Sequence, residues 1–236
     1  MLPSPIRMSV RAHVEGSSPL SHGFQGYKAL PSQKQDPAHI LEAIQRFQRQ
    51  SESDNCEPTC FKNVMDELSS RTGVRKLRRG LRELNRLFDY RKGHFCDSDL
   101  GISNLNDILS PLGYNVRKTY GSRSGLNLLS QAIGDERSSY VIAAVSPEYF
   151  GEQVFGYKVT GEPHVDHALI VLSTDNQTVS FFDPYENYLK AKRVADIKTK
   201  LPLVKFSQHW GNASRPQWMA WVVPAAMPLE AYGGTR

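Results

Sequence analysis

Cys56 occupies a point in the sequence where a thiol can be activated as a nucleophile. The residues after it, 57–68 (EPTCFKNVMDEL), place Pro58 in a first helical turn and apolar residues at helical spacing. They predict a helix that begins beside Cys56. The free N–H groups and the dipole at a helix N-terminus stabilise an anion and lower the pKa of a thiol. The sequence therefore favours a thiolate at this position.

A thiol hydrolase also needs a histidine that holds the proton and a group that orients this histidine. His167 begins one apolar run, 167–172, and Asp183 directly follows the next, 178–182. The turn-rich residues between the runs predict a β-hairpin, in which the ends of the two strands lie side by side. We therefore expect Asp183 to orient His167, and His167 to accept the proton of Cys56.

An oxyanion also needs donors, and two groups near Cys56 could supply them. One is the backbone N–H of Cys56 itself. The other is the side-chain amide of Gln50, six residues earlier in the chain.

This pattern resembles the papain-like cysteine peptidases, in which a Gln precedes the nucleophilic Cys by six positions and the Cys begins the first long helix. It is most similar to the bacteriocin-leader-processing branch, the double-glycine peptidase-like branch, which continues with a His before a hydrophobic run and a later Asp-Pro. The resemblance covers roughly residues 48–224. The matching residues are Gln50, Cys56, Pro58, Thr59, Cys60, Phe61, His167, Asp183 and Pro184, and Phe206, Trp210 and the closing strand resemble the tail of that family.

The resemblance implies an α+β chain with a papain-like fold, in which an N-terminal helical half packs its nucleophile helix on a C-terminal antiparallel sheet. It implies a catalytic triad of Cys56, His167 and Asp183 with Gln50 as oxyanion donor, acting on a protein or peptide substrate without a cofactor or metal. Cleavage of a peptide bond is the first expectation. A glutamine deamidase or transglutaminase-like effector stays open, because only the leaving group or the acceptor changes.

The sequence departs from the family at Glu57, where the family usually has Gly. A carboxylate beside Cys56 opposes thiolate formation by like charge, although it favours the helix N-terminus. It could narrow access to the thiol, select basic substrates or mark an inactive enzyme. A catalytically inactive papain-like binding module is therefore a further alternative.

The contact surface of such a module would be the basic stretch 71–92, which holds nine Lys or Arg and two acidic residues. Its Leu and Phe residues fall on one face, which predicts a basic amphipathic helix with a weak point at Gly80. The charged face is either simply solvated or a docking surface for an acidic partner, an anionic membrane or nucleic acid. Aromatic residues are not interleaved with the charges, which counts against binding of single-stranded nucleic acid.

The remaining cysteines and histidines have ordinary explanations. Cys60, one turn inside the predicted helix, is expected in the core. His164 lies before the predicted strand and not at its first residue, so His167 is the better candidate for the catalytic base. Three cysteines exclude a framework made only of disulfides, and the spacing of Cys56, Cys60 and Cys96 does not suit zinc.

The composition divides the chain into three parts. Residues 1–37 are rich in Ser, Pro, Gly and Gln, and they predict a disordered arm or an address such as a transit peptide or the leader of a secreted effector. Residues 38–224 form the predicted hydrolase domain, and 225–236 a C-terminal tail. Helices dominate the first half of the domain and antiparallel strands the second, as expected for the α+β class.

Bulk properties limit the location and the partners of the chain. It has no apolar run long enough to span a membrane and no secretory signal, and its free thiols suit a reducing environment. We expect a soluble protein that is cytoplasmic or delivered into a reducing compartment. A net charge of +5 does not by itself indicate nucleic-acid binding.

Overall fold

The computed structural model describes residues 34, 36–50, 55–92, 96–120, 123–146, 167–175, 177–185, 200–210 and 217–226, all within the compact unit Pro31–Arg236. Its helices are α1 (Pro37–Arg46), α2 (Cys56–Thr72), α3 (Leu81–Leu87), α4 (Ser98–Leu109), α5 (Arg123–Gly134) and α8 (Leu203–Trp210), with 3₁₀ turns η2 (Arg75–Leu77) and η3 (Ser110–Leu112). Its strands are β1 (Tyr114–Tyr120), β2 (Val141–Val145), β3 (His167–Thr174), β4 (Thr178–Phe182), β5 (Lys200–Pro202) and β6 (Trp218–Pro224).

The six strands form one antiparallel sheet in the order β1-β6-β2-β3-β4-β5. Strand β2 is buried along its whole length and pairs with β3 on one side and β6 on the other. The expected hairpin is present, because β3 and β4 are joined by a short turn around Asp175. The α+β class predicted from the sequence is thus confirmed.

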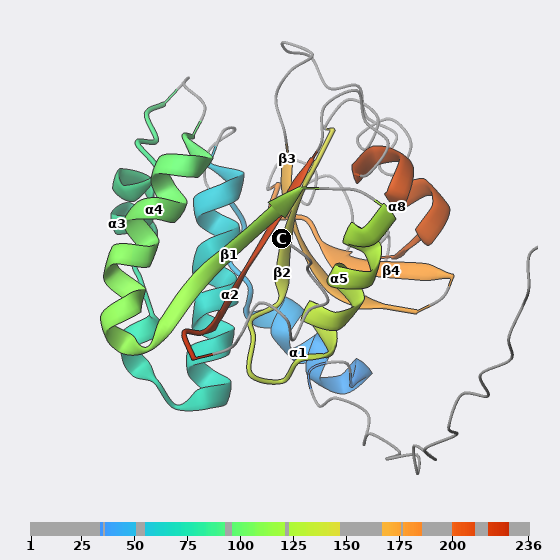
Figure 1. Cartoon of the computed structure of the whole chain (residues 1–236), viewed down its shortest axis with the longest axis horizontal. Coiled ribbons are helices and arrows are strands. Elements are labelled where there is room, and N and C mark those ends of the chain that lie inside the picture. The colour runs from blue at the N-terminus through green and yellow to red at the C-terminus, as the bar shows by residue number, and fades with distance from the viewer. Residues whose placement is uncertain are drawn as a thin grey trace, which may run out of the picture. The chain divides into compact units, whose positions relative to one another are not determined.

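Helices cover both faces of this sheet, with α2, α3 and α4 on one face and α5 and α8 on the other (Figure 1). Alternate residues of a strand point to opposite faces, so β2 contributes Ile142 and Ala144 to the first core and Val141, Ala143 and Val145 to the second. The first core takes the apolar stripe of α2, from Cys60 to Leu68. Strand β3 therefore lies directly against the helix that begins at Cys56.

The prediction of one basic helix over residues 71–92 is wrong. Helix α2 continues to Thr72 and ends at Gly73, whose φ of 74° is the left-handed conformation that favours glycine at a helix end. The chain then makes the turn η2, and α3 begins only after Gly80, which adopts an extended conformation. The apolar face of the stretch is present all the same, since Leu77, Leu84 and Phe88 are fully buried.

Side chains that accept backbone N–H groups begin two further helices. Helix α1 begins where Asp36 accepts a hydrogen bond from the Ala38 N–H, and it ends at Arg46. Helix α4 begins after Asp97, whose carboxylate caps the Leu100 N–H. Strand β5 and helix α8 were not predicted.

The predicted division into an arm, a domain and a tail stays a prediction. Residues 1–33 and 227–236 lie outside the described residues, whereas Lys34, within the predicted arm, is fully buried. Among the described helices, none has the length and apolar character needed to cross a membrane.

Candidate active site

Cys56 is the first residue of α2 and is partly exposed. The first N–H groups of a helix have no partner within the helix, so those of Cys56 and Glu57 stand beside the thiol. Thr59 closes the first turn, because its N–H and its hydroxyl both donate to the Asn55 carbonyl, at 3.2 and 2.7 Å. The thiol therefore lies at a firmly formed helix N-terminus.

The imidazole of His167 is held by a carboxylate from the neighbouring strand. His167 begins β3, Asp183 directly follows β4, and His167 Nε2 lies 2.7 Å from Asp183 Oδ1. The same oxygen accepts the backbone N–H of Tyr185 at 2.8 Å, which fixes the carboxylate in turn. Asp183 is buried, so this pair is shielded from solvent.

Cys56 lies close enough to His167 to interact with its imidazole. Because Nε2 faces Asp183, Nδ1 is the nitrogen that remains for the thiol, an assignment that follows from the hydrogen bonds. Burial alone would lower the pKa of His167. The charge of Asp183 and the hydrogen bonds to Asp183 and Cys56 outweigh it and raise that pKa well above the usual value. An imidazolium is the form that stabilises a thiolate.

Gln50 lies in an extended stretch after α1 and is almost fully buried. Its backbone N–H donates to the Pro184 carbonyl at 2.7 Å, next to the residue that holds His167. The structure therefore ties the segment before Cys56 to the end of β4. The role of the Gln50 amide as an oxyanion donor stays a prediction.

Glu57 is turned toward α4. Its side chain is buried, and Oε2 accepts a hydrogen bond from the Ser98 hydroxyl at 2.7 Å. Glu57 thus belongs to the contact between α2 and the first turn of α4.

The other residues weighed in the sequence fall outside this arrangement. Cys60 is fully buried, and burial, together with Cys56, Asp183 and Glu57, raises its pKa well above the ordinary value. Cys96 is partly exposed. His164 lies outside the described residues. Within the described ranges, no group of three or more His, Cys, Asp or Glu could hold a metal ion.

Two solved structures are similar in fold. The peptidase domain of Streptococcus ComA, described as a bifunctional ABC transporter of a quorum-sensing pathway, is 15% identical over 75% of this chain and 96% of that one, with a TM-score of 0.47. A putative C39-like peptidase from Bacillus anthracis is 16% identical over 74% of this chain and 92% of that one, with a TM-score of 0.44. No family model and no curated protein matches the chain.

Sequence reasoning missed the residues that support the triad candidates. Tyr185 places its ring edge-on to His167, with ring centroids 6.2 Å apart, and its N–H fixes Asp183. The only signal for it was its position two residues after Asp183. Ser98, the partner of Glu57, gave no signal, because it lies 41 residues away in the chain.

Proposed function

We propose that this chain is a papain-like cysteine peptidase in which Cys56, His167 and Asp183 act as a catalytic triad. The observation that supports the proposal best is that one imidazole meets a buried carboxylate through Nε2, at 2.7 Å, and also interacts with a thiol at a helix N-terminus. In this constellation the carboxylate orients the base and the base activates the nucleophile.

The reaction follows from these positions. The Cys56 proton passes to His167 Nδ1, and the thiolate attacks the carbonyl carbon of the substrate, placing a negative charge on its oxygen. The Cys56 N–H, with the Gln50 amide as the proposed second donor, stabilises that charge. His167 then protonates the leaving amine and a thioester forms. Water, deprotonated by His167, cleaves the thioester, releases the acid and restores the thiol.

The thiol itself provides the first test. We expect iodoacetamide to modify Cys56 at least about tenfold faster than Cys96 in the folded protein, because Cys56 is the first residue of α2 and interacts with the imidazole of His167. The variant Cys56→Ala should lose the fast phase, and the control Cys96→Ala should keep it. Equal rates at the two thiols would exclude the proposal.

The reaction class needs a second experiment, because a glutamine deamidase or a transglutaminase-like enzyme would use the same thiol. Intact masses of candidate protein substrates are compared after incubation with the wild type and with Cys56→Ala. Loss of a fragment indicates proteolysis, and a gain of about one dalton indicates deamidation. Equal labelling rates of Cys56 and Cys96, together with unchanged masses, would instead indicate a binding module.

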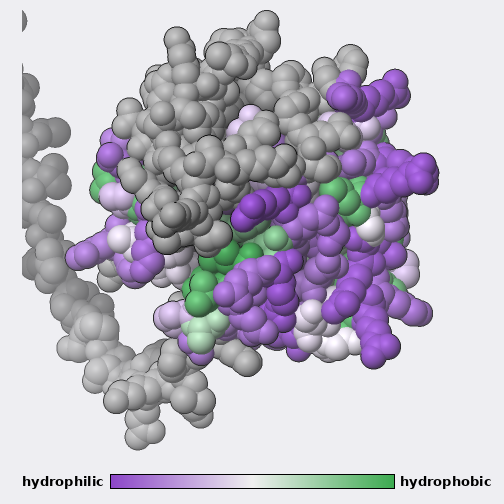
Figure 2. Space-filling model, turned by 180° about the vertical axis from the view of Figure 1, so that it is seen from behind, coloured by the Kyte–Doolittle hydropathy of each residue, from purple (hydrophilic) through white to green (hydrophobic). Residues whose placement is uncertain are grey.

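We further propose that the basic stretch 71–92 docks an acidic protein partner. It carries a net charge of +7, while the whole chain carries +5 and the other residues therefore −2. Figure 2 shows a strongly hydrophilic surface on the side formed by α2, α3 and α4. Arg71 turns inward to Glu67, and Arg79 pairs with Glu83 at 3.7 Å. The exposed cations are Arg75, Lys76, Arg78, Arg82, Arg86, Arg91 and Lys92.

A further inference from the structure

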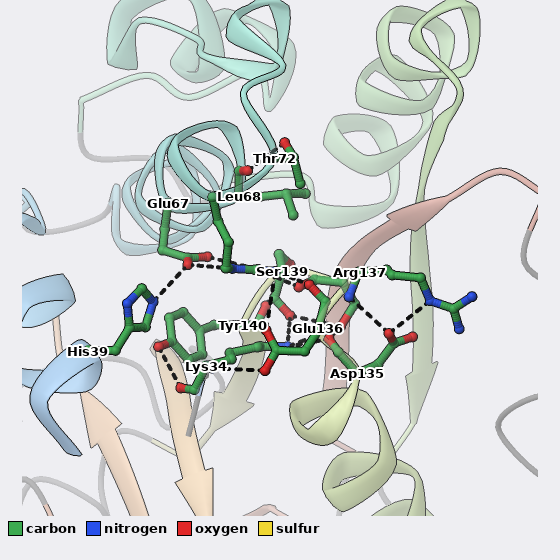
Figure 3. A network of polar contacts seen from close by, with 12 residues as sticks. Lys34, His39, Glu67, Leu68, Thr72, Asp135, Glu136, Arg137, Ser139 and Tyr140 are labelled. Atoms are coloured by element: carbon green, nitrogen blue, oxygen red, sulfur yellow. Dashed lines mark hydrogen bonds and ion pairs between the residues drawn. The ribbon is translucent and has the colours of Figure 1, made fainter. Parts of the chain in front are cut away.

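The amino group of Lys34 is fully buried among oxygen atoms at the C-terminal end of α5 (Figure 3). Nζ donates to the Ser139 carbonyl at 2.7 Å, to the Ala132 carbonyl at 3.0 Å and to the Asp135 carbonyl at 3.3 Å. It also lies 3.1 Å from the Ser138 hydroxyl. We call these four residues the amine cage.

The backbone of Lys34 is recognised as well as its side chain. Its N–H donates to Glu136 Oε1 at 3.0 Å, and its carbonyl accepts the Tyr140 hydroxyl at 2.9 Å. The ring of Tyr140 lies 5.5 Å from Nζ, within reach of a cation–π contact. One residue is therefore held at three points by a segment about 100 positions away in the chain.

Polar contacts from α2 hold the residues of the amine cage in place. Arg71 of α2 donates to the Ser138 carbonyl at 2.7 Å and also to the Glu136 carbonyl. Its guanidinium pairs with Glu67 at 2.8 Å, and Glu67 in turn lies 3.2 Å from His39 of α1 (Figure 3). The cage thus connects α1, α2 and the turn between α5 and β2.

The surroundings of Lys34 also disfavour its charged form. Burial, together with repulsion by Arg71, lowers the pKa of Lys34 to about 7, against the opposing charges of Glu67, Asp135 and Glu136. Nζ donates to three cage carbonyls and to the Ser138 hydroxyl, and that hydroxyl donates in turn to the Ala132 carbonyl. Every cage oxygen that Nζ meets therefore accepts a hydrogen bond from it, as a primary amine requires.

We propose that the amine cage is a binding site for a primary amine, which Lys34 fills from within the chain and which thereby fastens the segment ahead of α1 to the domain. The site is remote from the candidate triad. Tyr140, which contacts Lys34, lies directly before the first residue of β2. His167 pairs with Val145, the last residue of β2, so the two sites lie at opposite ends of this strand. Glu67 likewise lies about 16 Å along α2 from Cys56, at 1.5 Å per residue.

Replacing Lys34 and adding an amine back tests the site directly. In Lys34→Ala, n-propylamine has the same three carbons and amino group that the substitution removes. We expect Lys34→Ala to lower Tm by at least about 5 °C at pH 9, and about 50 mM n-propylamine to recover about half of the loss in a saturable way. Tert-butylamine, whose branched carbon does not match the linear side chain of lysine, should recover little.

The matched control is Lys205→Ala, which removes an exposed lysine of α8. It should leave Tm unchanged and should not respond to n-propylamine. The proposal is overturned if the amine stabilises Lys205→Ala as much as Lys34→Ala, or if it stabilises neither.

A second variant keeps the test decisive if Lys34→Ala does not fold. Lys34→Met retains the apolar stem and loses the amine. A lysine whose pKa is lowered in the folded state favours folding more as the pH rises from its folded pKa toward its ordinary one. The Tm gap between wild type and Lys34→Met should therefore widen from pH 7 to pH 9, and a gap that stays constant or narrows contradicts the proposal. The alkylation rate of Cys56 should stay within about twofold, so this result is independent of the triad.

Discussion

At the scale of single residues, the hydrogen bond between His167 Nε2 and Asp183 determines which ring nitrogen faces the thiol. The tautomer with its proton on Nε2 leaves the lone pair of Nδ1 for the proton of Cys56. The carboxylate also raises the pKa of His167, so the imidazolium form of His167 persists to higher pH. A buried aspartate thus influences both the geometry and the pH range of the site.

Asp183→Asn should therefore lower kcat/KM by about 100-fold or more and move the alkaline limb of the profile to lower pH. The amide keeps the shape of the side chain but removes the charge that raises the pKa of His167. The pH dependence of Cys56 alkylation reports the same change without a substrate. Asp107→Asn, at an exposed position on α4, is the control and should leave both profiles unchanged.

Cys60 provides a second prediction at this scale. Its pKa is raised by burial and by the neighbouring Cys56, Asp183 and Glu57, and its side chain is inaccessible. In Cys56→Ala we expect Cys60 to resist iodoacetamide until the protein unfolds, so that its labelling rate follows the unfolding equilibrium. Rapid labelling of Cys60 under native conditions would show that the start of α2 opens locally.

Residue types, together with their places at the ends of predicted elements, were enough to propose the candidate site. Cys56, His167 and Asp183 could be proposed together because each stands at the end of an element, and ends of paired strands meet. Lys34 could not be found in this way. Its main acceptors are backbone carbonyls about 100 residues away, and no residue type marks a carbonyl that a fold leaves pointing inward.

At the scale of elements, glycine decides where the basic stretch breaks and how closely its parts pack. The regular apolar spacing from Leu77 to Phe88 predicted one helix, but that spacing cannot reveal that Gly73 takes a left-handed conformation. Helix α3 is therefore a separate short element against α4. Gly101 of α4 allows this contact, because a Cβ there would come within 2.4 Å of three ring atoms of Phe88.

Gly101→Ala should therefore lower the free energy of unfolding by about 1–3 kcal/mol, since the ring of Phe88 lies in the core and cannot yield freely. Gly80→Ala is the matched control, because a Cβ at Gly80 meets nothing within 4 Å. Urea unfolding of the two variants measures the difference. Equal stabilities would mean that α3 and α4 separate at little cost.

The exposed cations of the same elements bear on the proposed docking surface. Arg82→Glu with Arg86→Glu should weaken binding to poly-L-glutamate by about tenfold at low salt, because two attractive charges become repulsive. Lys200→Glu with Lys205→Glu makes the same charge change on β5 and α8 and should have a smaller effect. Similar losses in both pairs would show that net charge alone governs the binding.

At the scale of the whole molecule, the two hydrophobic cores lie on opposite faces of one sheet. They share its strands and the hydrogen bonds between those strands. Each residue of β2 faces one core while its neighbours face the other, so neither core can be lost without disturbing the strand that both share. The candidate triad lies where this shared sheet meets α2, and the amine cage lies at the other end of β2.

This arrangement predicts that both cores unfold together. Phe206 of α8 is fully buried in the second core, and Phe206→Ala should cost about 3–5 kcal/mol. If the cores are coupled, the urea midpoint falls equally when it is followed by Trp fluorescence, dominated by the second core, and by labelling of Cys60 in the first. Val204→Ala, at an exposed position of the same helix, should shift neither midpoint. Fluorescence that moves while Cys60 labelling stays in place would show instead that α8 and its core melt independently of the helices that hold Cys56.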